Sequence, residues 1–192
     1  MEGFVCKFLE KEGTRKHVLL VHNDTRQAKK IQFEFIKNGL VKNESCIFLI
    51  DHDKKIKHVK NEMKENGIDV KYYESKNRLR IYQIPQFDKD SDGIWLGFKK
   101  WSDKILGESI APFRIVGRII SDTSNEVSMS VQMVIEKNIH AVFDGLDASV
   151  LCHYDTREFP EKNCINVIAN LCKSHHLIIE IDGNNESVRH LP

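Results

Sequence analysis

Short apolar runs alternate with stretches of helical periodicity along the whole chain, and this order constrains the fold more than any other feature. Continuous apolar runs of this length are typical of strands that helices cover on both faces of a sheet. The alternation therefore predicts an α/β fold, a three-layer α/β/α sandwich around a mainly parallel sheet. The runs are His17–His22, Ser45–Ile50, Leu79–Ile84, Phe113–Ile120, Ser149–Tyr154 and His176–Ile181.

The segments between the runs carry the marks of helices. After the first run, Asp24 is a predicted N-cap, Gln27 is placed to complete a capping box, and Gly39 is expected to close the helix. Residues 51–53 are expected to cap the next helix in the same way. A later helix is predicted to bury a face formed by Val127, Val131, Val134 and Phe143.

Length and composition favour a single domain. The chain has 192 residues, of which 41% are hydrophobic, and it contains no internal repeat, low-complexity tract or interdomain linker. We expect a single domain over residues 1–192 with a core at about 15–183. Residues 1–16 are predicted to form a short lead-in strand or arm, and residues 184–192 a polar tail.

Charge, hydropathy and cysteine usage exclude several classes of protein. A formal net charge of +1 gives little attraction for nucleic acid or an acidic membrane. No apolar run approaches the roughly 20 residues of a membrane span, and residues 1–6 do not resemble a signal peptide. Five cysteines at irregular spacing argue against a disulfide framework. We therefore expect a cytoplasmic protein with no direct nucleic-acid or membrane contact.

One segment departs from the even charge balance. Lys54–Arg80 holds nine Lys and Arg residues against four Asp and Glu residues. This stretch is either the solvated face of a helix with its exit loop or a docking surface for an acidic partner.

Polar residues follow the predicted strands at the points where the strands end. Ligands of parallel α/β sheets bind beyond the carboxyl ends of the strands. Two of these residues have an alternative role. Asp155 is either a ligand contact or a turn residue. Arg118 binds either an anionic ligand or a carboxylate of the chain, such as Asp24, Asp51 or Asp155. The predicted ligand-binding residues are His22, Asn23, Asp24, Asp51, His52, Arg118, Tyr154 and Asp155.

The motifs that would carry chemistry in such a fold are missing. The first strand-to-helix turn, residues 22–26, has no glycine, and Asp24 would repel a phosphate there. No GxxxxGK[ST] or GxGxxG sequence occurs, and no CxxC or HExxH pair points to zinc. Cys152 falls in a strand and Cys164 on an apolar helix face, which favours structural roles. We therefore predict no catalytic residue, no metal site and no cofactor.

Five segments together resemble one known family. Leu151–Phe159 has the form C-x-Y-D-x-x-x-F, and the other four segments are His17–Asp24, Phe35–Glu44, Arg114–Gly117 and His175–Ile179. These segments are similar to the MEDS domain, the methanogen/methylotroph sensory domain that is also found in a dichloromethane-responsive regulator. The resemblance covers about residues 15–183.

The resemblance implies a RecA- or KaiC-like core with a degenerate P-loop, without Walker motifs. It also implies a sensory role in signal transduction, beside histidine kinases or transcription regulators and with small hydrocarbon derivatives as suggested ligands. This chain carries Arg118 after Gly117, where the family usually has an acidic residue. A cation at that strand end weakens an ATPase interpretation and shifts the expected ligand toward anions.

Three functions follow as hypotheses. The first is a stand-alone, non-enzymatic sensory domain that binds a small ligand at the strand ends and signals to a separate kinase or transcription regulator. The second is a divergent RecA-like nucleotide-binding protein or ATPase, which would hold phosphates with Arg26, Lys29 or Arg118. The third is a ligand-free adaptor that forms homo-oligomers through the segment 94–106.

Overall fold

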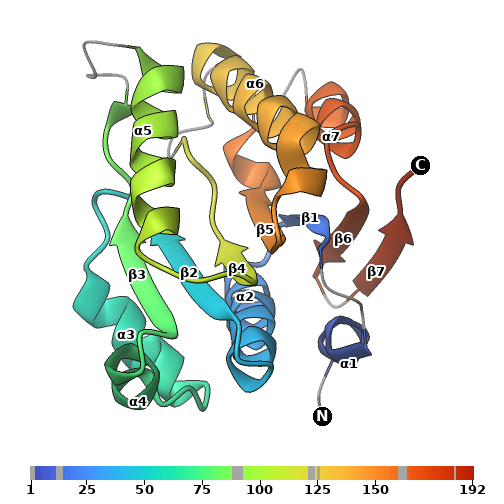
Figure 1. Cartoon of the computed structure of the whole chain (residues 1–192). Coiled ribbons are helices and arrows are strands. Elements are labelled where there is room, and N and C mark those ends of the chain that lie inside the picture. The colour runs from blue at the N-terminus through green and yellow to red at the C-terminus, as the bar shows by residue number, and fades with distance from the viewer. Residues whose placement is uncertain are drawn as a thin grey trace.

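A computed structural model describes residues 3–11, 15–87, 93–120, 124, 126–159, 164–183 and 185–192. These residues form one seven-stranded sheet with helices on both faces (Figure 1). The strand order is β3-β2-β4-β5-β1-β6-β7, and every neighbouring pair is parallel except β6 with β7. The predicted three-layer sandwich with a mainly parallel sheet is confirmed.

The strands coincide closely with the apolar runs. The fourth run gives a shorter strand than predicted, because Gly117, with φ of +152°, ends it. The strands are β1 (His17–His22), β2 (Ser45–Ile50), β3 (Leu79–Gln83), β4 (Phe113–Val116), β5 (Ala148–Asp155), β6 (Leu177–Asp182) and β7 (Asn185–His190).

Two layers of helices enclose the sheet. The first four helices pack on one face, and the last three pack on the other (Figure 1). None of the helices in the described part of the chain is long and apolar enough to span a membrane. The helices are α1 (Phe4–Lys11), α2 (Thr25–Val41), α3 (Ile56–Glu65), α4 (Val70–Ser75), α5 (Ile94–Gly107), α6 (Glu126–Val142) and α7 (Cys164–Cys172).

Burial on both faces explains why the strands read as unbroken apolar runs. Leu19 and Leu20 are neighbours in β1, and both are completely buried. Leu20 belongs to the core under α2, whereas Leu19 belongs to the core under α6 and α7. Side chains that alternate between two covered faces leave no position for a solvated residue.

The two ends of the chain differ from the sequence prediction. The lead-in segment contains α1 rather than a strand, because Val5 and Leu9 lie one helical turn apart and both are buried. The supposed polar tail forms β7, which pairs antiparallel with β6. The two elements support each other, since the Val5 amide donates to Glu186 Oε2 at 2.9 Å. Residues 1–2, 12–14 and 184 lie outside the described residues.

The start of α2 was predicted correctly only in part. Asp24 caps the helix by accepting hydrogen bonds from the amides of Arg26 at 2.9 Å and Gln27 at 3.0 Å. The Gln27 side chain does not close a capping box, because it donates to Glu186 at 2.7 Å instead.

Two other predicted helix boundaries are wrong. α2 continues past Gly39, which has another role: a Cβ atom there would lie 2.5 Å from Arg114 Cδ. Residues 51–53 do not cap α3, which begins at Ile56 after Lys55 and has no side-chain cap.

The buried face of α6 differs in part from the prediction, because Phe143 is buried and Val131 packs against the core, whereas the other two valines do not. Val127 and Val134 are 76% and 57% exposed. Gln132 and Glu136 are buried in their place, because Gln132 Nε2 donates to Glu136 Oε1 at 2.8 Å and so satisfies both groups. A polar pair therefore occupies the middle of the covered helix face.

Candidate functional site

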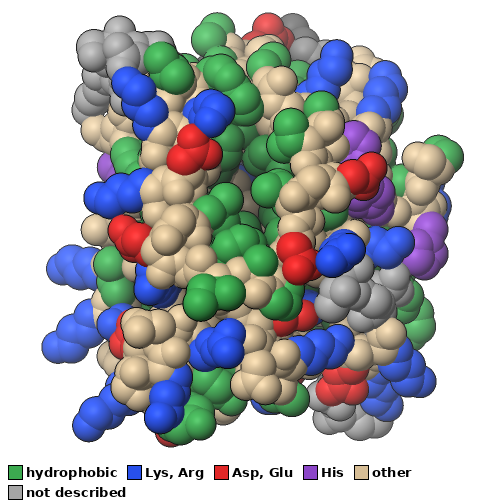
Figure 2. Space-filling model, in the orientation of Figure 1, with side chains coloured by type: hydrophobic (Ala, Val, Ile, Leu, Met, Phe, Trp, Pro, Cys, Tyr) green, Lys and Arg blue, Asp and Glu red, His purple; other side chains and the backbone are tan. Residues whose placement is uncertain are grey.

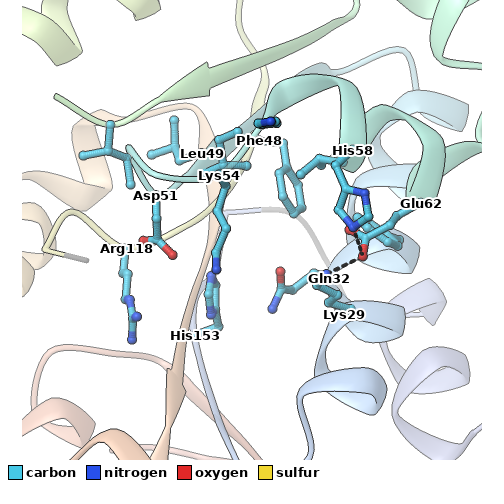
Figure 3. Close-up of a pocket in the computed structure, with 15 residues that line it drawn as sticks. Lys29, Gln32, Phe48, Leu49, Asp51, Lys54, His58, Glu62, Arg118 and His153 are labelled. Carbon is cyan, nitrogen blue, oxygen red and sulfur yellow. Dashed lines mark hydrogen bonds and ion pairs between the residues drawn. The ribbon is translucent and has the colours of Figure 1, made fainter. Parts of the chain in front are cut away.

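A small cavity opens at the carboxyl ends of the strands, between β2, α2 and α3 (Figure 3). Its volume is about 130 Å³. Asp51 and Arg118 line one wall, and Lys29, Gln32 and Glu62 line the opposite wall. Ligand pockets for organic molecules are commonly about 300–1,000 Å³, so this cavity suits only a very small molecule or ion.

Two of the basic side chains in this cavity, Lys29 and Arg118, are paired with carboxylates. Lys29 Nζ lies 2.5 Å from Glu62 Oε1, and His58 Nε2 lies 3.6 Å from the same oxygen. Arg118 forms an ion pair with Glu158, with NH1 2.8 Å from Oε2. The cavity therefore offers less net positive charge than its lysines and arginine suggest.

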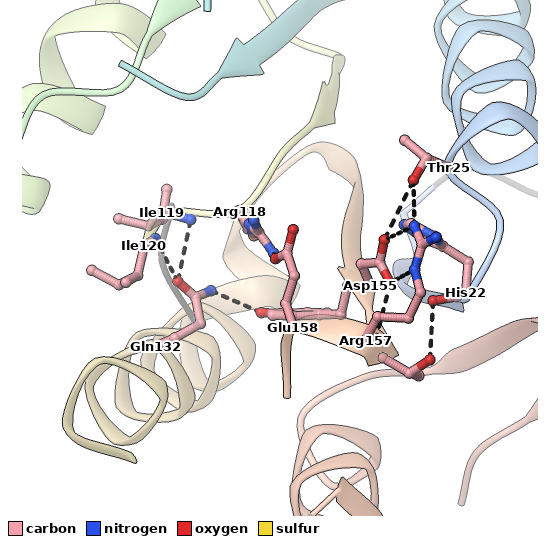
Figure 4. Close-up of polar contacts among 11 residues, drawn as sticks. His22, Thr25, Arg118, Ile119, Ile120, Gln132, Asp155, Arg157 and Glu158 are labelled. Carbon is pink, nitrogen blue, oxygen red and sulfur yellow. Dashed lines mark hydrogen bonds and ion pairs between the residues drawn. The ribbon is translucent and has the colours of Figure 1, made fainter. Parts of the chain in front are cut away.

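The ion-pair partner of Arg118 is not one of the carboxylates predicted from the sequence. The carboxylate that pairs with it is Glu158, beyond β5, and not Asp24, Asp51 or Asp155 (Figure 4). The guanidinium is 6% exposed and lines two separate cavities, the one at the strand ends and a larger one on the other face of the sheet.

His153 lies beside this guanidinium on β5. Desolvation, together with the charges of Arg118 and His22, lowers the pKa of His153 to about 3. His153 therefore lines the strand-end cavity as a neutral imidazole at neutral pH.

Asp155 belongs to a separate network at the end of β5 (Figure 4). Its carboxylate accepts hydrogen bonds from the Arg157 amide at 3.0 Å, from Arg157 Nε at 2.8 Å and from Thr25 Oγ1 at 3.3 Å. Hydrogen bonding to Arg157 holds the pKa of Asp155 at about 2. Burial lowers the pKa of the neighbouring His22, whereas the charge of Asp155 opposes that shift. Asp155 therefore has the turn role and joins β5 to the start of α2.

The remaining predicted residues are engaged away from both cavities. Asn23 binds the turn after β6, with Nδ2 2.5 Å from Asp182 Oδ1. Asp24 is the cap of α2, and His52 Nε2 lies 2.9 Å from the Gln86 side chain. Tyr154 is fully buried on the other face of the sheet. Of the eight predicted residues, Asp51 and Arg118 are the two that line these two cavities.

The larger cavity lies between α5 and α6, over β2, β4 and β5. Its volume is about 360 Å³, and Figure 2 shows a hollow with hydrophobic walls there. Trp95, Phe98 and Trp101 of α5 and Ile139 and Val142 of α6 form the sides. Leu49, Ile115 and Val150 form an apolar floor, in which the polar residues are Arg118, Glu136 and Cys152.

This cavity was not predictable from the strand-end rule, for a physical reason. The rule that ligands bind beyond the carboxyl ends of the strands selects residues in loops. Trp101 and Ile139 lie in helices, where their apolar spacing is the same as that of residues buried in the core. The signal that was available is the density of large apolar residues in α5, which exceeds what one buried face requires.

The fold defines the class, an α/β protein with a KaiC-like fold. A KaiC-like protein from the archaeon Pyrococcus horikoshii superposes with a TM-score of 0.62 at 13% identity, over 93% of this chain and 80% of that chain. A second protein from the same archaeon gives a TM-score of 0.64 at 12% identity, over 97% and 92%. Comparison with curated proteins gives no match.

The family follows from the sequence model. The model of the methanogen/methylotroph, DcmR sensory domain, MEDS, matches residues 16–176. The chain belongs to this family of sensory domains. The predicted resemblance and the KaiC-like fold are thereby confirmed.

Proposed function

We propose that this chain is a non-catalytic sensory domain that binds a small, neutral, largely apolar ligand in the cavity between α5 and α6. The size and lining of this cavity carry the proposal. Its volume of about 360 Å³ falls within the usual range for small-molecule sites, and a few polar groups lie in an apolar surround. Membership of a sensory-domain family supports a binding role.

The state of Arg118 argues for a neutral ligand rather than the anion expected from the sequence. An arginine in an apolar cavity attracts anions when its charge is unbalanced. Here the Glu158 carboxylate lies 2.8 Å from the guanidinium and balances that charge. Arg118 stands at the carboxyl end of β4, so the proposed site still reaches the edge of the sheet that the sequence nominated.

Nucleotide binding has weaker support. The amides at the start of α2 are where a phosphate would bind in a fold of this class. The Asp24 carboxylate accepts hydrogen bonds from two of those amides, so it occupies the position of a bound anion. Its negative charge also repels a phosphate. We therefore expect no stabilisation by MgATP.

A sensory domain must pass its signal to another protein. We propose a separate histidine kinase or transcription regulator as the partner and the basic surface of α3 and α4 as the contact. Lys and Arg side chains gather along this margin of the molecule (Figure 2). Lys57, Lys64 and Lys71 are exposed there. A partner with an acidic surface would match this charge.

The ligand site can be tested with benzene as the probe and benzoate as its anionic analogue. We expect benzene to raise the thermal midpoint and to shift NMR signals of α5 and α6, and benzoate at equal concentration to do so less. Ser102, on the cavity wall, and Ser130, on the exposed side of α6, both donate a hydrogen bond to a carbonyl of their own helix. Ser102→Trp should fill the cavity and abolish the benzene effect, whereas Ser130→Trp should leave it unchanged.

Three results would overturn the proposal. The first is a benzene effect that survives in Ser102→Trp, and the second is stronger binding of benzoate than of benzene. The third is a midpoint raised by MgATP, which would favour the nucleotide-binding alternative. Concentration-dependent mass in light scattering, with no response to benzene, would favour the oligomeric adaptor.

A further inference from the structure

Four potential metal ligands meet beside the cavity between α5 and α6, and two of them, Glu136 and Cys152, also line its floor. They come from four parts of the chain: His17 from β1, Glu136 from α6, Cys152 from β5 and His175 from the loop between α7 and β6. One ligand atom of each residue lies within 4.8 Å of the other three. All four residues are at most 3% exposed.

Four of the six distances between the ligand atoms are close to those of a tetrahedral site, and the other two are below 4.8 Å. His17 Nε2 lies 3.2 Å from Glu136 Oε2 and 3.4 Å from Cys152 Sγ. Glu136 Oε2 lies 3.4 Å from Cys152 Sγ and 3.6 Å from His175 Nε2. Bonds of about 2.0–2.3 Å to a central tetrahedral ion place the ligand atoms about 3.3–3.8 Å apart. Three of the four separations lie within that range, and the fourth, between His17 Nε2 and Glu136 Oε2, lies just below it at 3.2 Å.

The orientation of His175 calls for a cation. Its Nδ1 atom lies 2.7 Å from the Leu171 carbonyl oxygen, which can only accept, so Nδ1 carries the hydrogen. In the neutral ring Nε2 is then a bare lone pair that faces the cluster. Among the described residues no hydrogen-bond partner reaches this buried atom. A metal ion between His175 Nε2 and Glu136 Oε2 would stabilise this lone pair beside the carboxylate oxygen.

The Glu136 carboxylate is held in position by hydrogen bonds to its other oxygen. Oε1 accepts from Gln132 Nε2 at 2.8 Å and from the Tyr154 hydroxyl. Gln132 is fixed in turn, because its Oε1 accepts from the amides of Ile119 at 3.2 Å and Ile120 at 2.8 Å. Protein metal sites orient their ligands through such outer contacts. Oε2 is thereby left to face the cluster.

We propose that His17, Glu136, Cys152 and His175 bind one zinc ion in a closed tetrahedral site. One thiolate, one carboxylate and two neutral imidazoles carry a charge of −2, which a divalent cation neutralises. Sulfur, nitrogen and oxygen ligands in a tetrahedron favour zinc over magnesium or calcium. Four protein ligands leave no open position, so the ion has a structural role and joins α6 to the sheet.

No metal site was predicted from the sequence, because the known zinc motifs have compact spacing. These ligands are far apart in the sequence, and only the fold brings them together. The Gln132–Glu136 pair on α6 was also hidden, since the helix was expected to bury valines.

Elemental analysis of the chain purified without an affinity tag tests the site directly. We expect about one zinc per chain. After removal of the metal and loading with cobalt, we expect the visible spectrum of a tetrahedral ion and a thiolate-to-cobalt charge-transfer band. Cys152→Ser should abolish the charge-transfer band and reduce bound metal at least about tenfold. Cys172→Ser is the matched control, a half-buried thiol on α7 outside the cluster, and should retain both.

X-ray absorption at the zinc edge of the unsubstituted chain avoids any dependence on the folding of a variant. One sulfur and three nitrogen or oxygen neighbours are expected. A folded chain that contains no metal and takes up neither zinc nor cobalt would overturn the site. Bound zinc without a sulfur neighbour would show an ion elsewhere and would equally overturn it. A stoichiometric metal other than zinc would overturn the choice of ion. None of these measurements depends on the sensory ligand.

Discussion

Arg114 and Glu44 form a two-pronged ion pair inside the core, under α2. Arg114 Nε lies 2.5 Å from Glu44 Oε2, and NH2 lies 3.1 Å from Oε1, while both side chains are 3% exposed. The guanidinium also stacks on Phe35, with Cζ 4.6 Å from the ring centroid. The contact joins β4 to the residue that precedes β2, so it holds two neighbouring strands at the end opposite the candidate site.

Removal of one charge from this pair should be costly. We expect Glu44→Gln to lower the free energy of unfolding by about 3–5 kcal/mol, because the Arg114 charge stays buried without its counter-ion. Urea denaturation measures this value. The exposed pair between Lys99 and Asp103 is the control, and Asp103→Asn should cost less than about 1 kcal/mol. Equal losses in the two variants would contradict the expectation.

The Arg114 side chain occupies the space beside Gly39 that a larger residue's Cβ atom would fill. A Cβ atom at Gly39 would lie 2.5 Å from Arg114 Cδ and 2.8 Å from Cys46 Sγ. We expect Gly39→Ala to destabilise the fold by about 1–3 kcal/mol through overpacking. A Cβ atom at Gly107, in the last turn of α5, would meet no atom of the described residues within 4 Å. Gly107→Ala should therefore be neutral or stabilising by up to about 1 kcal/mol, and a gain at Gly39 would refute the packing argument.

Asp155 should make the stability depend on pH in the acid range. Its pKa in the folded chain is about 2, below the value of about 3.9 for an unfolded chain. The stabilisation is thus complete above about pH 4 and is lost as the pH falls through about 2. Asp155→Asn should cost about 1–2 kcal/mol at pH 5, and the difference from the unsubstituted chain should shrink toward pH 2. Urea unfolding across this range would disprove the assignment if the difference stayed constant.

Tryptophan fluorescence should report on the proposed ligand cavity. The chain contains two tryptophans, and both Trp95 and Trp101 line the cavity between α5 and α6. Benzene in that cavity should shield them, so we expect weaker quenching by acrylamide when benzene is present. Unchanged quenching, at a benzene concentration that raises the thermal midpoint, would place benzene at another site.

The strands were predictable from the sequence because burial on both faces of a sheet leaves an unbroken apolar run. The two ends of the chain were not. β7 is half solvated, so its burial alternates and its composition resembles a tail. α1 spans eight residues and has only Val5 and Leu9 fully buried, which is too short a pattern to separate from a strand.

The candidate sites were predicted less completely, because hydrophobic periodicity carries no information on hydrogen bonding. Gln132 and Glu136 are buried through their contacts with each other and with Tyr154, while Val134 on the same helix is exposed. The strand-end rule found Asp51 and Arg118. It could not show that Glu158, four residues beyond Tyr154, neutralises Arg118.

The position of β1 in the sheet has a consequence for synthesis on the ribosome. β1 precedes the other six strands of the sheet in the chain, yet its two neighbours are β5 and β6, which are made more than a hundred residues later. Until then the apolar segment His17–His22 has neither of its native partners and resembles an aggregation-prone edge. The centre of the sheet therefore cannot pair until β5 and β6 have been made, and in the meantime α2, which packs on β1, is the helix placed to cover one face of this strand.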